Sequence, residues 1–326
     1  MEEELKKIRK SSNTIILVTS VLLCFIVLSA YITNGLPRNI EKIVPNKEQL
    51  ITHVDDLKLS PFTDSEEDKL ASYGEKLIKE TYNYFYEKNG NKIGNHLACT
   101  NCHLNGGTKA FAAPYVGLTG VFPVYIGRED KIESLEERIN GCFERSMNGK
   151  AIDVNSMEMR AIITYIKHIS KNTPTGKRIV GQGFVKVKTP KRAADPKSGA
   201  IVFQQQCQSC HGQQGEGKKL ATNKGYQYPP LWGKDSYNDG AGMARVLTAM
   251  QFIKGNMPLG ATHDNPILTD AEAYDVAAYI NSFSRPIKAN KEKDYPNLAK
   301  KPKDSPYPPF HDNISAIQHK YGPFNF

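Results

Sequence analysis

The sequence predicts a mainly helical protein with two tandem domains of the same plan, preceded by a membrane segment. Three observations support this prediction. The pattern Cys-x-x-Cys-His occurs twice, at residues 99–103 and 207–211. Each copy is followed by a segment with apolar residues at helical spacing. An almost uninterrupted apolar run, Ile15 to Ile32, lies near the N-terminus and is just long enough to span a bilayer.

The two Cys-x-x-Cys-His patterns indicate covalent attachment of two c-type haems. In such a site each thiol bonds one haem vinyl group, and the adjacent imidazole reaches the iron. A zinc site or a dithiol switch can use Cys-x-x-Cys without the histidine, so the repeat of the full pattern argues against both. We expect covalent attachment at Cys99, Cys102, Cys207 and Cys210, and iron ligation by His103 and His211.

The apolar run near the N-terminus follows a basic segment that contains Lys6, Lys7, Arg9 and Lys10. It is long for a signal-peptide core, so we favour an uncleaved anchor over a cleaved signal and a soluble periplasmic protein. The basic N-terminus then stays in the cytoplasm, and the remaining chain lies on the periplasmic side of the bacterial inner membrane. Covalent haem attachment agrees with this location because it takes place outside that membrane. Cys24 falls within the segment as a small apolar residue.

The charge of the chain favours an anionic partner. Lys and Arg number 43 against 34 Asp and Glu, which gives a formal net charge of +9. The basic-aromatic motifs of nucleic-acid recognition are absent from the sequence, so we expect a soluble anionic substrate and no nucleic acid. Apolar content of 39% and charged content of 24% are typical of a globular protein.

Composition and turn residues divide the chain into six parts. They are an anchor or signal (1–33), a polar tether (34–62), a first haem domain (63–175), a Gly/Lys/Pro-rich linker (176–196), a second haem domain (197–285) and a Lys/Pro-rich C-terminal strap (286–326). Each haem domain is expected to adopt a class I cytochrome c-like fold, in which an N-terminal helix packs across a C-terminal one. The strap is expected to lie across the domains, and its residues give no sign of catalysis.

The first haem domain is expected to open with a helix capped by Thr63 or Ser65, which has an acidic first turn and runs through Ile78. Its partner is expected over residues 157–169, where apolar residues recur at helical spacing. His168 lies in this second helix, and we assign it to packing or to the surface and not to metal ligation.

The second haem domain repeats this order. A segment from Ser198 leads into the second haem motif, and a later helix is expected to begin at Asp270. Tyr165-Ile166 and Tyr279-Ile280 hold equivalent places after their haem motifs, which indicates two homologous domains. A further helix is expected over residues 241–252.

A haem that only transfers electrons takes a second axial ligand. In the second domain Met257 is the candidate, because a methionine followed by proline downstream of the haem motif is how many small cytochromes present their thioether. Met243 and Met250 fall in the helix expected over residues 241–252 and are assigned to the core. Lys254 lies one turn before Met257 and is a competing ligand, although a solvated lysine is the simpler interpretation.

The first domain has no methionine of this kind. Its candidate segment is a helix that begins with a capping box, Ser134 with Glu137, and ends near Asn148-Gly149. Two ligand interpretations compete there. Met147 could bind iron and leave Cys142 as a buried thiol. We favour Cys142, because an unpaired cysteine in an oxidising compartment is a liability and because neighbouring cations favour its thiolate. The side chains that share its helix face are Arg138 and Ser146, with Arg145 beside them.

These residues carry a family resemblance. The chain resembles the thiosulfate dehydrogenases, dihaem c-type cytochromes that interconvert thiosulfate and tetrathionate. The resemblance rests on the first haem motif followed by Gly106-Gly107, on the Arg-Ile-Asn-Gly-Cys-Phe-Glu-Arg-Ser-Met-Asn-Gly segment at 138–149, and on Asn256-Met257-Pro258, and it covers roughly residues 72–283. It implies that Cys142 ligates the first haem. It also implies a substrate pocket lined by Arg128, Arg138 and Ser146.

The resemblance also bears on the second haem. Some family members carry a lysine immediately before the methionine and switch ligands on reduction. This chain has Asn256 at that position, so stable ligation by Met257 is expected.

The activity implied is the conversion of two thiosulfate ions into one tetrathionate with release of two electrons, or the reverse. The His/Cys haem would be catalytic, and the His/Met haem would relay electrons to or from a carrier such as another cytochrome c. Cys142 is our candidate nucleophile. Arg128 and Arg138 are expected to bind the sulfonate oxygens, with Arg145 or Lys150 as helpers. A non-catalytic dihaem electron carrier is the alternative, but it leaves the arginines around Cys142 without a role. A component of another sulfur-oxidation system with cysteine-ligated haem is a third interpretation.

Overall fold

The computed structural model describes residues 1–35, 50–88 and 91–324. Within these ranges the chain is mainly helical and contains three short antiparallel strand pairs. The α-helices are α1 (Glu2–Gly35), α2 (Glu66–Lys79), α3 (Thr81–Phe85), α4 (Leu104–Gly107), α5 (Leu135–Arg145), α6 (Met157–Ile169), α7 (Pro196–Gln206), α8 (Gln208–His211), α9 (Val246–Asn256), α10 (Asp270–Ile280) and α11 (Ala316–Tyr321). The strand pairs are β1 (Glu87–Lys88) with β2 (Asn91–Lys92), β3 (Val124–Ile126) with β4 (Lys131–Glu133), and β5 (Lys218–Lys219) with β6 (Tyr226–Tyr228).

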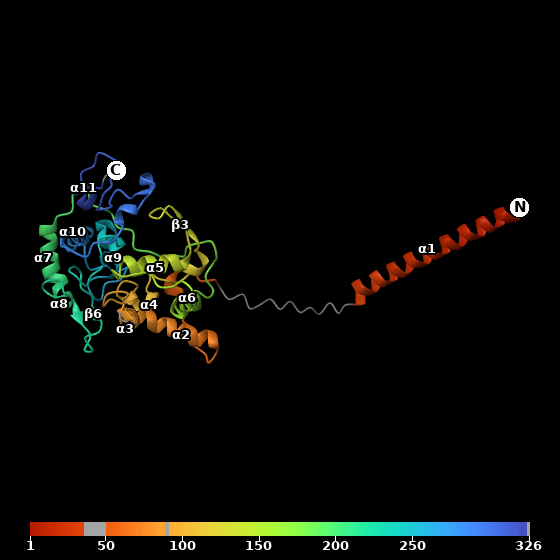
Figure 1. Cartoon of the computed structure of the whole chain (residues 1–326), viewed down its shortest axis with the longest axis horizontal. Coiled ribbons are helices and arrows are strands. Elements are labelled where there is room, and N and C mark those ends of the chain that lie inside the picture. The colour runs from red at the N-terminus through yellow and green to blue at the C-terminus, as the bar shows by residue number, and fades with distance from the viewer. Residues whose placement is uncertain (36–49, 89–90, 325–326) are drawn as a thin grey trace. The chain divides into compact units, whose positions relative to one another are not determined.

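The N-terminal unit, residues 1–49, contains the long helix α1 (Figure 1). Its stretch Glu2–Ala30 is long and apolar enough to cross a membrane, by length and composition alone. A signal sequence near an N-terminus passes the same test, so α1 does not by itself distinguish an anchor from a signal. Residues 36–49, the first part of the expected tether, lie outside the described ranges.

Residues 50–326 form a second compact unit that contains both haem motifs. Its first helix, α2, begins after Ser65, whose hydroxyl accepts the backbone N–H of Asp68 at 3.2 Å, as expected from the sequence. Helix α2 packs across α6, and the two backbones meet at Gly74. A Cβ atom there would lie 2.0 Å from the carbonyl oxygen of Ala161, so the crossing requires glycine.

The second half of this unit repeats the same crossing with α7 and α10. A Cβ atom at Gly199 would lie 2.0 Å from the carbonyl oxygen of Asp275, so this pair also crosses at a glycine. Helix α10 begins after Thr269, which forms a capping box with Glu272. The repeat expected from the sequence is therefore present as two matching helix pairs, each next to one Cys-x-x-Cys-His motif.

Each helix pair has its own hydrophobic core. The first core is built around α2 and α6, with Leu77, Phe143 and Tyr165 fully buried. The second is built around α7, α9 and α10, with Phe203 and Tyr274 among its buried side chains. Two separate cores in one compact unit agree with two domains that fold on the same plan and pack together.

The helix expected over residues 241–252 is displaced in the structure. A short 3-10 helix covers Gly242–Ala244, and α9 begins only at Val246. Between them Arg245 has an extended backbone, and its guanidinium binds the carboxylate of Asp304, with Nε to Oδ2 at 3.0 Å. This contact with a distant residue interrupts the helix, so Met243 lies outside α9 while Met250 lies in the second core.

The described part of the tether and the linker, both expected to be simple connectors, pack against the rest of the compact unit. Val54, in the part of the chain assigned to the tether, is 2% exposed. Its N–H donates to the carbonyl of Val180 in the linker at 2.8 Å, and the N–H of Val180 donates to the carbonyl of Thr52 at 2.9 Å. The linker also bonds to the first haem domain, where the N–H of Phe111 donates to the carbonyl of Gly181 at 2.7 Å. Residues 50–62 and the linker are therefore part of the compact unit.

The C-terminal strap is folded as well. The strap, drawn in blue in Figure 1, lies beside the hairpin of β3 and β4 and includes α11. Lys301 is buried in it and donates from Nζ to the carbonyls of Tyr307 at 2.7 Å and Pro309 at 2.8 Å. Near its end, the carbonyl of Tyr321 accepts the hydroxyl of Tyr274 on α10 at 2.9 Å.

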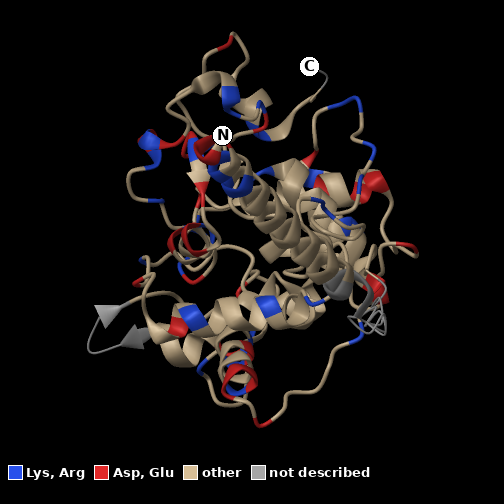
Figure 2. Cartoon of the chain, turned by 90° about the vertical axis from the view of Figure 1, so that its right-hand side faces the viewer, with Lys and Arg blue, Asp and Glu red and all other residues tan. Residues whose placement is uncertain are grey.

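Charged residues are distributed widely over the molecule. In the view of Figure 2, blue basic segments and red acidic segments are interspersed along helices and loops. The positive net charge is therefore not gathered into one basic surface in this view. A cation that serves the chemistry of the protein has to be identified from its individual contacts.

Candidate active site

The first haem motif presents its histidine in the form required of an iron ligand. A 3-10 helix, Cys99–Asn101, is followed by α4, and His103 lies between them. The Nδ1 atom of His103 lies 2.5 Å from the carbonyl oxygen of Ala113, and its ring stacks on Tyr115 at 4.4 Å. A carbonyl at Nδ1 fixes the tautomer with hydrogen on Nδ1 and leaves Nε2 free to bind a metal.

The second motif is built in the same way. His211 ends α8 and is buried, and its Nδ1 lies 2.8 Å from the carbonyl oxygen of Pro229. Burial lowers the pKa of His211, which favours the neutral imidazole that a metal requires. Cys207 and Cys210 lie at the same short helical turn, and neither forms a disulfide with a described residue.

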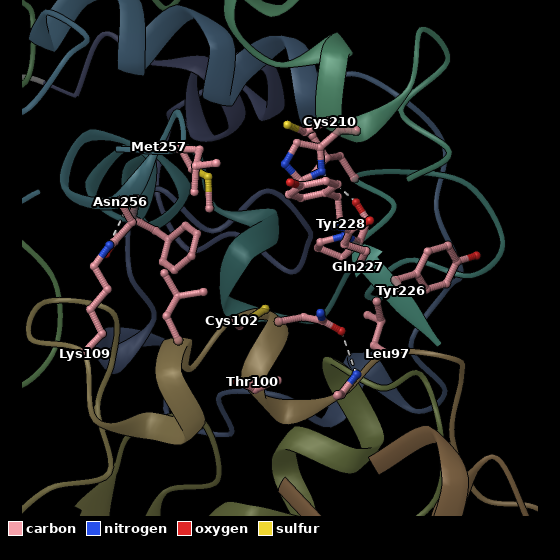
Figure 3. A pocket seen from close by; sticks show the side chains of 18 of the residues that line it. Leu97, Thr100, Cys102, Lys109, Cys210, Tyr226, Gln227, Tyr228, Asn256 and Met257 are labelled. Atoms are coloured by element: carbon pink, nitrogen blue, oxygen red, sulfur yellow. Dashed lines mark hydrogen bonds between the residues drawn. The ribbon is translucent and has the colours of Figure 1, made fainter. Parts of the chain in front are cut away.

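The cavity beside the second motif is large enough for a macrocycle. Its volume is about 1400 Å³, above the ~300–1,000 Å³ range of ordinary small-molecule sites. In Figure 3, Cys210 and Met257 reach into it from the second domain, and Cys102 and Lys109 from the first. The thiols, the free imidazole nitrogen and a thioether in one cavity fit the attachment and ligation of a haem.

Met257 directly follows α9 and lines this cavity. Its competitor Lys254 is occupied elsewhere, because its Nζ donates to the carbonyl of Leu268 at 2.6 Å and pairs with Asp270 at 2.9 Å. Lys254 is thus a paired lysine and not the solvated one of the simpler interpretation. Met243 packs against the second core, as expected, and also lines the cavity.

Cys142 lies in the middle of α5, which begins at the expected capping box of Ser134 and Glu137. Arg138, one turn earlier, directs Nη1 at the Cys142 sulfur at 3.4 Å. Burial alone raises the pKa of Cys142, but Arg138 and the imidazole of His103 outweigh it and lower that pKa to about 6. The structure therefore brings Cys142, Arg138 and His103 together and favours a thiolate at neutral pH.

The competing residue, Met147, is a core residue. It is 4% exposed and belongs to the first hydrophobic core with Phe85 and Phe143. Cys142, in contrast, interacts directly with the His103 ring. Of the two sulfur ligands considered from the sequence, the geometry supports Cys142.

Ser146 follows α5 one turn after Cys142, and its N–H donates to the carbonyl of Cys142 at 2.8 Å. Its side chain is partly exposed, and no hydrogen bond of its hydroxyl to another described residue is found. Ser146 thus lies on the same helix face as Cys142, as the spacing indicated.

Arg128 lies in the turn between β3 and β4. Its Nε is buried and has no hydrogen-bond acceptor among the described residues. The contacts that the structure gives for Arg128 are with the strap: its carbonyl accepts the N–H of Tyr295 at 2.7 Å. Within the described ranges, no hydrogen bond or ion pair joins Arg128 to Cys142.

The expected helper Arg145 is not available to an anion, so that expectation is wrong. It is buried, and its two terminal nitrogens bind Asp294 at 2.8 and 2.6 Å. A third contact joins it to Glu129 at 3.5 Å. The other expected helper, Lys150, is exposed just after α5. The cation that contacts the Cys142 sulfur is therefore Arg138.

Sequence reasoning missed several residues of this region. Tyr115 stacks on His103, Lys109 reaches the cavity of the second motif, and Asp294 and Tyr295 of the strap contact the arginines. The strap residues come from a segment outside the haem domains, and Lys109 lines a cavity to which both haem domains contribute. The three tyrosines of the strap were the sequence signal for these contacts.

Comparisons with known proteins agree with this geometry. The family model "SoxA/TsdA, cytochrome c domain" matches residues 83–175, and the model "Cytochrome c" matches residues 196–284. The expected fold of two tandem cytochrome c domains is thus confirmed. The two domains imply two covalently bound c-type haems.

The chain is similar along most of its length to curated relatives. It is 47% identical over 216 residues to a thiosulfate dehydrogenase of Psychrobacter arcticus, a match that covers 66% of this chain and 64% of the relative. It is 41% identical over 218 residues to that of Stutzerimonas stutzeri, covering 67% and 68%. The match to the Allochromatium vinosum protein is 41% identical over 199 residues and covers 60% and 72%.

A solved structure gives the same result. The thiosulfate dehydrogenase TsdBA from Marichromatium purpuratum, in its "as isolated" form, superposes with a TM-score of 0.66 at 33% identity. The superposition covers 72% of this chain and 51% of that one, so this chain spans about half of the solved protein. With two cytochrome c domains and relatives of this similarity, the chain belongs to the thiosulfate dehydrogenase family.

Proposed function

We propose that this protein interconverts thiosulfate and tetrathionate at Cys142, and that its second haem domain exchanges the electrons with a redox carrier. The observation that carries the proposal is the placement of a reactive thiolate. Cys142 Sγ lies 3.4 Å from Nη1 of Arg138 and beside His103, and its pKa is lowered to about 6. A pure electron carrier needs neither a thiolate nor a cation beside it.

The haem-binding residues follow from the two motifs. Cys99 and Cys102 would hold the first haem covalently, and His103 and Cys142 would bind its iron. Cys207 and Cys210 would hold the second haem covalently, and His211 and Met257 would bind its iron. When bound, a haem supplies one-electron transfer and an iron position that a sulfur side chain can occupy.

Arg138 and Arg128 are the cations we assign to the sulfur anions. Two thiosulfate dianions held about 5 Å apart repel by roughly 13 kcal/mol at an effective dielectric of about 20. Coupling them therefore requires fixed positive charge, and a guanidinium can bind a sulfonate group through two parallel N–H bonds. The hydroxyl of Ser146, on the same face as Cys142, is suited to donate a further hydrogen bond.

In the reductive direction, the Cys142 thiolate attacks one of the two central sulfur atoms of tetrathionate. The Sγ–S bond forms as the central S–S bond breaks, and one thiosulfate leaves with the electron pair of that bond. Cys142 is left as the Sγ–S–SO3 adduct. Two electrons from the donor then cleave the Sγ–S bond, which restores the thiolate and releases the second thiosulfate. Thiosulfate oxidation is the reverse of these steps.

The two sulfur ligands proposed for the irons give the electron path a direction. Thiolate ligation by Cys142 favours a low potential, whereas thioether ligation by Met257 favours a high one. Electrons from thiosulfate would accordingly move toward the second domain and leave to a carrier such as another cytochrome c.

The proposed location is the periplasmic side of the bacterial inner membrane, with α1 as anchor. Two features support it: the stretch Glu2–Ala30 has the length and composition of a membrane span, and c-type haem is attached outside that membrane. A cleaved signal would instead release a soluble periplasmic protein.

The test is an assay of the purified holoprotein in both directions. Thiosulfate with an artificial electron acceptor should give tetrathionate, and tetrathionate with a reduced donor should give thiosulfate. The Cys142→Ser holoprotein is the control. Absence of turnover in both directions with wild-type holoprotein would contradict the proposal and favour an electron carrier.

A further inference from the structure

The C-terminal strap packs directly on the hairpin turn that carries Arg128. The N–H of Tyr295 donates to the carbonyl of Arg128 at 2.7 Å. Beside it, a Cβ atom on Gly127 would lie 3.3 Å from the Cβ of Lys300, so the two backbones are in close contact. Tyr295 is itself 5% exposed. The position of Arg128 is thus fixed by the strap and not by its own two-stranded hairpin alone.

Arg128 is held with part of its hydrogen-bonding capacity unused. Burial lowers the pKa of Arg128, but the nearby phenol oxygens of Tyr295 and Tyr307, together with a side-chain hydrogen bond to Tyr295, outweigh it and raise that pKa. Its Nε is nevertheless buried and, within the described chain, lacks an acceptor. Buried N–H groups are almost always bonded, so an N–H left over in a candidate anion site is a donor for a ligand oxygen.

Asp294, the strap residue before Tyr295, has the opposite effect on Arg145, because it occupies the donors of that guanidinium. Asp294 accepts two hydrogen bonds from Arg145, at 2.8 and 2.6 Å, and one from the hydroxyl of Tyr307 at 2.7 Å. Arg145 lies three residues after Cys142 on α5, so this neutral pair is one helical turn from the sulfur. Its charge and its donors are used up by the strap.

Tyr295 adopts a backbone conformation that an aromatic residue rarely adopts. Its φ angle is 59°, in the left-handed region. Such a conformation persists only where the surrounding contacts determine it, and it is often found at functional sites. Here the contacts are the backbone bond to Arg128 and the burial of the ring, with Nζ of Lys301 lying 5.7 Å from its centre.

Building on the proposed function, we propose that Tyr295 is a positioning residue that holds Arg128 ready to bind a sulfonate oxygen. Asp294 meanwhile withdraws Arg145 from the substrate. The strap would thereby decide which of two neighbouring arginines serves the sulfur anion. This gives a functional role to a segment whose sequence showed no sign of catalysis.

The experiment compares three full-length holoproteins with wild type: Tyr295→Phe, Arg128→Gln and the double variant. Tyr295→Phe keeps the ring and the backbone bond but removes the phenol oxygen. Loss of one hydrogen bond to a charged group should raise KM for thiosulfate and tetrathionate about tenfold, with kcat within about twofold. In the Arg128→Gln background the same change should leave KM unaltered, because its effect passes through Arg128.

Tyr321→Phe is the matched control, since it removes a phenol from the same strap in α11, and its KM should equal that of wild type. Arg128→Lys provides a second probe, which keeps the charge, loses the Nε–H and should be insensitive to Tyr295→Phe. An unchanged KM in Tyr295→Phe, or an equal rise in the Arg128→Gln background, overturns the positioning role. A wild-type holoprotein that turns over neither sulfur anion refutes the proposed function instead.

Discussion

The two haem regions share one frame and differ in the side chain that approaches the histidine. In both, a helix pair crosses at a glycine whose Cβ would lie 2.0 Å from a carbonyl oxygen. In both, the histidine Nδ1 is held by a carbonyl, at 2.5 Å from Ala113 and 2.8 Å from Pro229. The frame therefore presents a metal-binding imidazole in the same way twice, and the difference in chemistry has to arise elsewhere.

The difference in chemistry arises in the helix that lies between each haem motif and the last helix of the same domain. In the first region this is α5, and its sulfur, Cys142, lies in mid-helix with Arg138 one turn before it. In the second it is α9, and its sulfur, Met257, follows the last helical residue. A mid-helix position fixes a thiolate and a cation rigidly together, whereas the residue after a helix supplies a neutral thioether alone. On the proposed function, α5 would carry the reactivity and α9 the electron relay.

The strongest test of this comparison is at Cys142. Cys142→Ser should abolish both tetrathionate reduction and thiosulfate oxidation, because nucleophile and ligand are lost together. Both haems should remain attached, since their own thiols are untouched, and the spectrum of the second haem should not change. Cys142→Met separates the roles: a sulfur ligand returns, but no adduct can form, so this variant should also be inactive.

The measurements are turnover in both directions and mass spectrometry of wild type after exposure to tetrathionate. Thiosulfate-derived mass should be found on the peptide that contains Cys142. An active Cys142→Met holoprotein would show that sulfur chemistry takes place without a covalent adduct, and α5 would then act only as a ligand helix.

The next largest effect is expected on stability, at Arg145. Its pair with Asp294 is buried on both sides, so Arg145→Gln should lower the free energy of unfolding by about 3–5 kcal/mol. Hydrogen bonds from Arg145 and Tyr307 outweigh burial and lower the pKa of Asp294. That contribution is therefore complete above the unfolded-state pKa and is lost as the pH falls through the lower folded-state pKa.

Denaturant unfolding of the holoprotein at neutral and acid pH measures this prediction. Lys167→Gln is the control, because its ion pair with Glu67 is exposed and should contribute less than about 1 kcal/mol. Equal losses in the two variants would mean that the strap is held by its other contacts.

Arg138→Gln tests the cation of the first region. The loss of a charge-assisted contact in the transition state should lower kcat/KM for both sulfur anions. The corresponding rise in activation free energy is about 2–4 kcal/mol. The absorption spectra of both haems should remain close to wild type. Steady-state kinetics at low substrate measure the effect, and unaltered kinetics would identify Arg138 as an ordinary surface residue of α5.

The sequence predicted what local rules determine. The capping box at Ser134 and the cap at Ser65 set helix starts, because a cap and its partner lie three residues apart. The helix expected from Asp270 also begins there. The spacing of Arg138, Cys142 and Ser146 on one helix face was likewise readable, since it depends only on the helical period.

Contacts between distant segments could not be read from the sequence. Arg145 was expected to serve the substrate, but its partner Asp294 lies 149 positions later. The start of α9 was placed too early because the break at Arg245 depends on Asp304, 59 positions away. Lys109 was missed for the same reason, since it lines a cavity shared by the two domains and donates to the carbonyl of Ala261, 152 positions later. Whether a cation is free to bind substrate, and where a helix is interrupted, therefore depend on tertiary structure.

A smaller effect is expected at Met257. Met257→Gly should leave the second haem attached through Cys207 and Cys210, but it should remove the weak sulfur-to-iron charge-transfer band and lower the potential of that haem. Optical spectroscopy and a redox titration measure both. Met250→Leu is the control, because Met250 is buried in the second core and such a swap conserves volume. Persistence of the band would point to Met243, which lines the same cavity.

The smallest effect is expected at Lys254. This residue tests whether the second haem keeps the same iron ligands in both redox states. The Lys254 ammonium is held at the start of α10 by the carbonyl of Leu268 and by Asp270, at 2.6 and 2.9 Å. Because the Asp270 side chain is 38% exposed, Lys254→Gln should cost about 1 kcal/mol or less of stability. The spectra and midpoint potential of the second haem should match wild type in both redox states. If a spectral change that accompanies reduction of wild type disappears in Lys254→Gln, the lysine leaves Asp270 to bind iron in one redox state. The iron of the second haem would then exchange ligands on reduction. The two regions would differ in the mobility of an iron ligand as well as in the charge of the ligand.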